Sequence, residues 1–232
     1  MRIWDIDPGF LNDRSLLGEH RELHGIASIL IHQKKGYSRH PETLRWVGRL
    51  PALAVRHSLL LAEMRLRGFK HRSPLPPLRA ELVWPEGYID SPARQYAILG
   101  RKYLDKAPGR IPLPKNATEL WANHKYSVMA RDYNAYRRYG KLVAARQLGF
   151  DQLALEMVAW LRLEPPAAAF GNALLHMWGY VAAASPLKPE VLSRQGMLLE
   201  IQRLAMARSG PEYLRHSTAL AEGAHWCPKD GV

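Results

Sequence analysis

The sequence predicts an all-α protein with two helical parts joined by a proline-rich linker. Apolar residues recur at helical spacing through most of the 232 residues. Alternation typical of β-strands is almost absent, and residues 81–84 are the one stretch that indicates a short strand. Prolines and glycines gather in the stretches 73–92 and 108–114, through which a helix is not expected to run.

These breaks divide the chain into residues 1–73, an irregular linker at 74–116, and residues 117–232. In the first part, apolar periodicity predicts helices over 13–32 and 51–68, the second beginning at Pro51 and ending at Gly68. In the last part the predicted helices are 117–129, 132–148, 151–162, 168–184, 189–208 and 211–222. Glycines and prolines mark most of their ends.

Composition and charge narrow the function classes. No apolar run approaches the roughly 20 residues that span a bilayer, so we expect no membrane partner. The single cysteine, Cys227, excludes an internal disulfide and fits a cytoplasmic protein. The net charge is +12, and residues 1–73 carry half of the excess. A basic segment is expected of a protein that contacts a phosphate backbone, although a generally basic proteome or a solubility effect would also explain it.

The helix at 13–32 places two carboxylates differently. At about 100° per residue, one arc collects the residues Leu16, Leu23, Ile26, Ala27 and Leu30. Glu19 falls inside this arc. Glu22 lies at its margin beside Gly18 and Gly25, while Arg21 points away. Since each mid-helix glycine costs ~1 kcal/mol relative to alanine, we expect something to approach the helix backbone closely there. Without further context, the two acids would be surface residues paired with Arg or Lys.

Three motifs change that interpretation. They are Gly-Glu-His-Arg-Glu-Leu at 18–23, Lys-Gly-Tyr-Ser-Arg-His-Pro-Glu-Thr-Leu-Arg-Trp at 35–46, and Ala-Glu-Met-Arg-Leu-Arg-Gly-Phe at 62–69. In order and spacing they resemble the pyrimidine-dimer DNA glycosylases of the endonuclease V type. The resemblance covers about residues 1–73 and implies a glycosylase, with abasic-site (AP) lyase activity, that acts on damaged or modified double-stranded DNA.

The resemblance also implies roles for residues. The family uses its N-terminal amine as nucleophile together with a helical Glu, which correspond to the α-amine of Met1 and to Glu22. An α-amine titrates near pH ~8, so part of it is neutral and nucleophilic at physiological pH. The expected DNA contacts are Arg2, Arg14, Arg21, Arg45 and Arg49. Arg45 and Arg49 recur with Arg56 around Trp46, as a phosphate stripe or as a solvated face beside a buried Trp. No metal or other cofactor is expected.

This chain departs from the family at two places. Arg2 follows Met1, whereas the phage enzyme exposes the amine of a Thr after its Met is removed; the nucleophile here would be a retained Met1. Arg14-Ser15 replaces a Gln-His pair that relatives carry before the Leu-Leu pair. This second departure leaves the lyase step and the lesion open. It also leaves open an alternative, a non-catalytic nucleic-acid-binding protein.

The last part has its own resemblance. The segments 120–130, 136–144 and 172–180 look like the YbgA-like bacterial domain of unknown function, over about residues 117–222. Its polar residues would line a candidate groove or serve as packing and capping contacts: His124, Lys125, Tyr126, Arg137 and His176. A third alternative is therefore a protein directed to RNA or modified nucleotides by this part. His225 and Cys227 lack a second ligand pair, so we predict no metal there.

Overall fold

The computed structural model describes residues 1–76 and 81–227, and within them every regular element is helical. This confirms the all-α prediction. The α-helices are α1 (Asp13–Ile31), α2 (Pro41–Arg45), α3 (Leu50–Leu66), α4 (Pro92–Lys102), α5 (Ala117–Met129), α6 (Tyr133–Ala144), α7 (Phe150–Leu161), α8 (Ala167–Trp178), α9 (Arg194–Met206), α10 (Glu212–Arg215) and α11 (Ala219–Trp226). Three 3₁₀ turns accompany them: η1 (Pro8–Phe10), η2 (Ala182–Ala184) and η3 (Pro189–Val191).

Helices α1, α3, α5 and α7 lie within two residues of their predicted bounds. Local capping explains the agreement where it is closest. The Asn12 side chain accepts the Ser15 N–H at the start of α1, and Asn116 accepts the Glu119 N–H at the start of α5. Each cap satisfies a backbone donor that the helix itself leaves unpaired.

Other predicted bounds were wrong for local reasons. The helix predicted over 168–184 ends at Trp178. The one predicted over 189–208 begins only at Arg194, because Pro189 opens a 3₁₀ turn and Ser193 caps the helix. The one predicted over 132–148 ends at Ala144, close to Arg146 with its φ of 55°. The segment 211–222 divides into α10 and the start of α11.

Two short helices escaped prediction. Both begin with a proline in the first turn, where the missing N–H costs nothing: Pro41 follows the cap His40, and Pro92 follows the cap Ser91. The predicted irregular segment 74–116 therefore contains α4. The strand predicted at 81–84 does not form; residues there have no regular structure.

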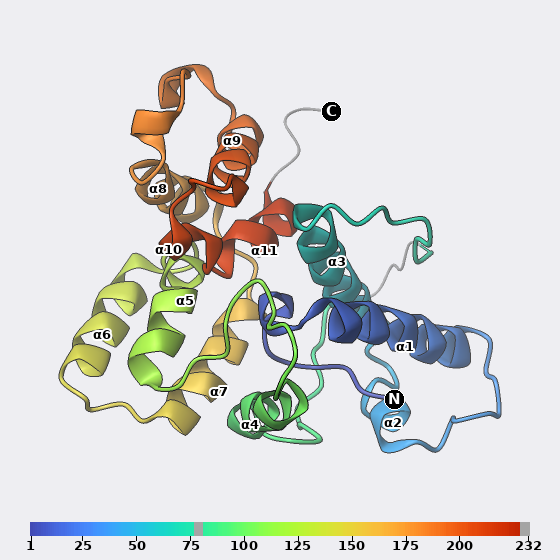
Figure 1. Cartoon of the computed structure of the whole chain (residues 1–232). Helices are drawn as coiled ribbons and strands as arrows, with labels where there is room; N and C mark the ends of the chain where they lie inside the picture. The colour runs from blue at the N-terminus through green and yellow to red at the C-terminus, as the bar shows by residue number, and fades with distance from the viewer. Residues whose placement is uncertain (77–80, 228–232) are drawn as a thin grey trace.

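The hydrophobic cores cross the predicted segments. One core contains Leu16, Leu53, Leu99, Leu120 and Val158, so all three segments contribute to it. A second core joins the later helices through residues such as Phe170, Ile201 and Leu220. Helix α11 packs against α3 as well as α5 and α9, and it crosses the middle of the molecule in Figure 1. The chain's last described helix thus returns to the first part.

The N-terminal segment is fixed between α1 and the segment before α5. A Cβ on Gly109 would lie 2.6 Å from the Gly9 carbonyl oxygen, so only glycine allows the two backbones to approach this closely. The same carbonyl accepts the Ile111 N–H at 2.9 Å. These contacts hold η1 and so direct residues 1–7 along α1 (Figure 1). No helix formed by the described residues is long and apolar enough to cross a membrane.

Candidate active site

Two carboxylates of α1 hold the N-terminal segment in place. The Trp4 N–H donates to Glu19 Oε1 at 3.2 Å, and the Arg2 N–H donates to Glu22 Oε2. Two residues of extended chain span roughly 6.6 Å and three residues of helix rise about 4.5 Å, so carboxylates three residues apart can each bind one of these N–H groups. As a result, Glu22 lies next to the first peptide of the chain.

Glu19 has a structural environment. Its side chain is 2% exposed, and both carboxylate oxygens accept hydrogen bonds from Arg56, at 2.7 and 2.9 Å. Arg56 also donates to the Ile6 carbonyl at 2.8 Å. Burial raises the pKa of Glu19, while the Arg56 guanidinium opposes that shift. Glu19 and Arg56 therefore join α1, α3 and the N-terminal segment inside the protein.

Glu22 lies at the edge of an open face of α1. Glu22 itself is half-buried. Arg14, Gly18, Arg21 and Gly25 are spaced by three and four residues and fall within about 60° of one another around the helix. Both arginines are exposed, and a Cβ on either glycine would meet nothing within 4 Å. No described part of this chain makes the close approach expected at the glycines, so the face is open to an external partner.

Arg2 and Arg49 reach the surface near this site. The Arg2 guanidinium binds Asp90, stacks 4.7 Å from the centre of the Trp4 ring and keeps 29% of its side chain exposed. The hydrogen bond from Arg2 lowers the pKa of Asp90. Arg49 is 30% exposed, and its nearest carboxylate, that of Glu86, is 4.0 Å away. Both cations therefore remain partly accessible to phosphate.

Arg45, which was predicted to contact DNA, is instead buried among carboxylates of this chain. Its side chain is 7% exposed and binds Asp5 at 2.9 Å and Glu42 at 2.6 Å. It also donates to the Ile3 carbonyl at 3.1 Å. Arg45 and Arg56 are thus internal ion-pair partners beside a buried Trp46, and the predicted phosphate stripe is wrong for both. Helical spacing alone does not distinguish an exposed arginine from one whose carboxylate partner comes from a distant segment.

The candidate C-terminal residues do not form one groove. His124 and Tyr126 are buried; His124 stacks on Phe10 at 5.5 Å, and burial lowers its pKa to about 4. Lys125 lies over the rings of Tyr126 and Tyr213. Arg137 and His176 are exposed on α6 and α8. Packing, the alternative considered from the sequence, accounts for His124 and Tyr126.

Comparison with known families identifies the segment that carries this geometry. Residues 1–77 match the pyrimidine dimer DNA glycosylase family. The match covers α1, α2 and α3, including the two carboxylates and the open face, and it supports a DNA glycosylase function with DNA as the substrate. It covers about a third of the chain, and the resemblance of residues 117–222 to the YbgA-like domain stays a prediction.

No curated protein and no solved structure matches the chain.

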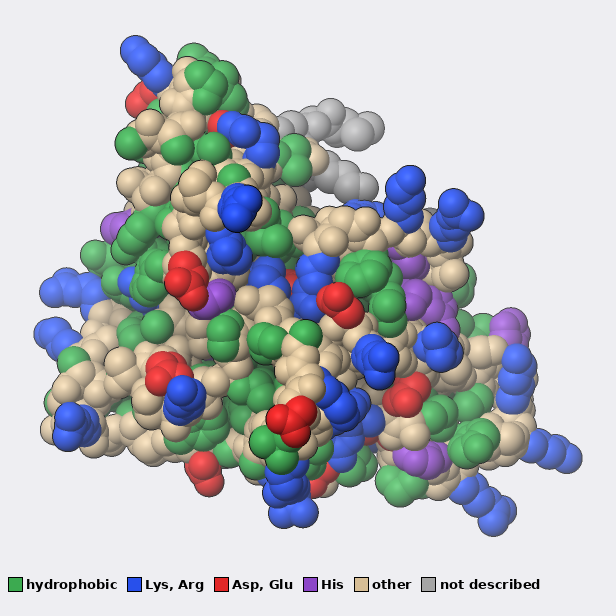
Figure 2. Space-filling view, viewed as in Figure 1, with side chains coloured by type: hydrophobic (Ala, Val, Ile, Leu, Met, Phe, Trp, Pro, Cys, Tyr) green, Lys and Arg blue, Asp and Glu red, His purple; other side chains and the backbone are tan. Residues whose placement is uncertain are grey.

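Within the matched residues 1–77, the loop between α1 and α2 adds basic residues that the site prediction missed. Lys34, Lys35 and Arg39 are exposed, and Tyr37 is 72% exposed with a φ of 57°. Lysine and arginine side chains project from this edge of the molecule in Figure 2. The sequence contained this signal, because Lys35, Tyr37 and Arg39 belong to the second family motif and Lys34 directly precedes it.

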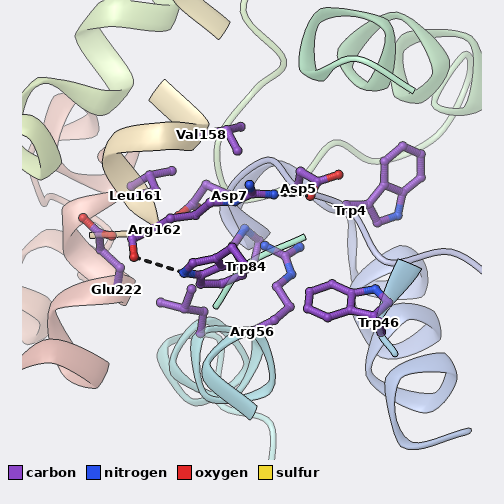
Figure 3. A pocket seen from close by; sticks show the side chains of 12 residues that line it. Trp4, Asp5, Asp7, Trp46, Arg56, Trp84, Val158, Leu161, Arg162 and Glu222 are labelled. Atoms are coloured by element: carbon purple, nitrogen blue, oxygen red, sulfur yellow. Dashed lines mark hydrogen bonds and ion pairs between the residues drawn. The ribbon is translucent and has the colours of Figure 1, made fainter. Parts of the chain in front are cut away.

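Side chains from residues 1–77 also line part of a small cavity of about 20 Å³. Figure 3 shows its charged lining, which includes Asp5, Asp7, Arg56, Arg162 and Glu222. Arg162 binds Asp5 at 2.9 Å across it, and Trp84 donates to the Arg162 carbonyl at 3.2 Å. A cavity of this size admits about one water molecule, so it is too small to bind a nucleotide.

Proposed function

We propose that this protein is a DNA glycosylase with AP lyase activity, in which the α-amine of Met1 is the nucleophile and Glu22 transfers protons. The family match supports the glycosylase activity of residues 1–77. The assignment of Met1 and Glu22, the Schiff-base step and the lyase step are our proposals.

One contact carries the assignment: the Glu22 carboxylate accepts the Arg2 N–H. By covalent geometry the nitrogen of Met1 lies roughly 3–4 Å from that of Arg2. The amine and the carboxylate are therefore neighbours, as a nucleophile and its proton acceptor must be. Glu19 does not fit this role, because Arg56 already binds both of its oxygens.

The proposed reaction begins when the neutral amine attacks C1′ of the damaged nucleotide. A C–N bond forms, and the glycosidic bond breaks with its electron pair leaving on the base. One amine proton passes to Glu22, the nitrogen electron pair forms the C=N bond as the C1′–O4′ bond breaks, and O4′ takes the proton from Glu22, which gives a protonated imine. Glu22 then takes the C2′ proton, and the 3′-phosphate leaves in a β-elimination. Water releases the amine by hydrolysing the imine.

The open face of α1 supports a DNA position that suits this reaction. Arg14 and Arg21 would bind phosphates, and Gly18 and Gly25 let the DNA backbone approach the helix. Flipping the target nucleotide, or the base opposite it, would bring C1′ to the amine. Arg2, Arg49 and the loop carrying Lys35 and Arg39 would extend the contact.

Borohydride trapping tests the nucleophile directly. Reduction of the imine should join the protein covalently to abasic and to UV-damaged duplexes, and mass spectrometry of the adduct should locate the DNA on residue 1. Acetylating or tagging the N-terminus should abolish trapping and leave DNA binding intact.

A C-terminally tagged protein is the matched control and should trap at the wild-type level. If the N-terminally blocked protein is trapped at the wild-type level, the nucleophile is a lysine and not the α-amine of Met1. Binding without any trapping or base release would favour the non-catalytic alternative.

A further inference from the structure

Four histidines come together on the flank of α1 opposite Glu22. His20 and His24 are one helical turn apart on α1, His57 comes from α3, and His71 follows α3. One nitrogen from each of them lies within 4.8 Å of the others. Histidine side chains gather over α1 on the face that Figure 2 shows. On the helix, Glu22 and His24 are about 160° apart, so the cluster is separate from the candidate active site.

The spacing of these nitrogens fits a common ligand. His24 Nε2 is 3.3 Å from His20 Nε2 and 3.2 Å from His57 Nε2. Tetrahedral zinc with Zn–N bonds of about 2.0–2.1 Å places its ligand nitrogens about 3.3–3.4 Å apart. The two nitrogen–nitrogen separations, 3.3 and 3.2 Å, are therefore close to those expected around a zinc ion.

In the described part of the chain, one nitrogen of the cluster, His71 Nε2, lacks the hydrogen bond that a buried polar atom needs. Among the residues that the structure describes, His71 Nε2 is buried without a hydrogen-bond partner, although the His71 ring contacts the rings of His20 and His57. Buried polar atoms in folded proteins are nearly always paired, so an unpaired nitrogen on a histidine that belongs to this cluster requires an explanation. A cation bound among the four histidines would give each nitrogen a partner.

The surroundings of three of the imidazoles, those of His20, His24 and His57, favour the neutral form. Burial, followed by the neighbouring histidines, lowers the pKa values of His20 and His57 to about 4. Burial and His71 lower the pKa of His24. Neutral imidazole is the form that binds metals. The Ser73 backbone opposes this lowering of the pKa at His24 and at His57.

We propose that His20, His24, His57 and His71 form a binding site for a divalent transition-metal ion, with Zn²⁺ the best fit to the spacing. Imidazole ligands suit zinc, copper, nickel and iron, and the absence of a carboxylate disfavours magnesium and calcium. The bound ion would join α1 to α3 and to the segment after it. This proposal differs from the expectation of no metal drawn from the sequence, and it does not depend on the proposed glycosylase reaction.

The test is a zinc titration of the full chain after treatment with a chelator. We expect one Zn²⁺ per chain by competition with a chromophoric chelator, and a melting temperature that rises with zinc concentration. His71→Gln and His20→Gln should weaken binding by more than the roughly 10–100-fold typical of losing a second-shell partner. His32→Gln is the matched control, because His32 is exposed at the end of the same helix.

Cobalt substitution keeps the proposal testable if a variant fails to fold. Wild-type protein with Co²⁺ should show the absorption bands of a tetrahedral nitrogen site without thiolate charge transfer. Thiolate bands would place the metal at Cys227 instead. Wild-type affinity in both His71→Gln and His20→Gln, or the absence of stoichiometric binding, would overturn the proposal.

Discussion

At the scale of single residues, two glutamates three positions apart on α1 differ completely in environment. Glu19 is buried and bound by Arg56, whereas Glu22 is half-buried beside the start of the chain. A difference of about 60° around the helix is enough to move a carboxylate from the core to the edge of an open face. Because their environments differ, the same Glu→Gln substitution at Glu19 and at Glu22 can be compared for its effects on stability and on rate.

Glu22→Gln should slow base release and strand cleavage by about 10²–10⁴-fold, because the amide cannot transfer the proton. Its melting temperature should stay near the wild-type value, since Gln still accepts the Arg2 N–H. Single-turnover kinetics and thermal unfolding measure the two effects.

Glu19→Gln should show the opposite pattern. Leaving Arg56 buried without a charged partner costs roughly 3–5 kcal/mol, so this variant should lose stability. A Glu22→Gln variant with the wild-type rate would remove Glu22 from the mechanism.

At the scale of the element, α1 presents four different faces. Its apolar side enters the core, one flank carries Glu22, the other carries His20 and His24, and the outward side carries Arg14 and Arg21. Periodicity of 3.6 residues keeps these sets apart along 19 residues. The outward side is the part of α1 that we expect to bind phosphate.

This expectation predicts a salt dependence. Affinity for undamaged duplex should fall between about 50 and 200 mM salt, because phosphate contacts release bound cations from DNA. Arg14→Ala and Arg21→Ala should each lower the magnitude of the log–log slope by about one. Fluorescence anisotropy at several salt concentrations measures the slope.

Arg208→Ala is the control, since Arg208 is exposed beyond the family segment. It should leave the slope unchanged. If Arg14→Ala and Arg21→Ala behave like this control, the open face of α1 does not bind the duplex.

At the scale of the whole molecule, buried charges join residues 1–77, which match the family, to the rest of the chain. Arg110 binds Glu63 of α3 at 2.7 Å and donates to the backbone carbonyls of Arg215 and Ser217. Asp7 lies in the same interior. Burial, together with the charges of Glu63 and Glu222, raises the pKa of Asp7 to about 7 against the opposing charge of Arg110. The predicted parts therefore share one charged interior.

Asp7 makes the stability of the protein depend on pH. Its pKa is higher in the folded state than the ordinary 3.8, so the folded state binds the proton more tightly. The free energy of unfolding should therefore fall as pH rises from about 4 to about 7, by up to about 4 kcal/mol. Asp7→Asn should reduce the loss of stability between pH 5 and pH 8 in urea unfolding. Asn still accepts the Gly9 N–H that Asp7 binds at 2.7 Å.

Asp132→Asn is the control, because Asp132 also caps a helix but is exposed. Its pH dependence should match that of the wild type. An unchanged pH dependence in Asp7→Asn would show that other groups dominate the interior.

The sequence by itself determined most helices, the buried position of Glu19, the exposed position of Arg21 and the resemblance of about residues 1–73 to the family that the comparison then matched. Helical periodicity and capping are local, so they can be read from neighbouring residues. The family motifs likewise lie within short runs. The prolines at the first positions of α2 and α4 are also local signals, and they mark the starts of the two helices that were not predicted.

Only the tertiary structure decided which distant residues meet. Arg45 is internal because Asp5 lies beside it, and Glu22 is a candidate catalytic residue because the first peptide lies against it. The four histidines converge because α1, α3 and the segment after α3 cross at one place. These contacts depend on how helices pack across long separations in sequence, and side-chain periodicity within one helix carries no information about its partners.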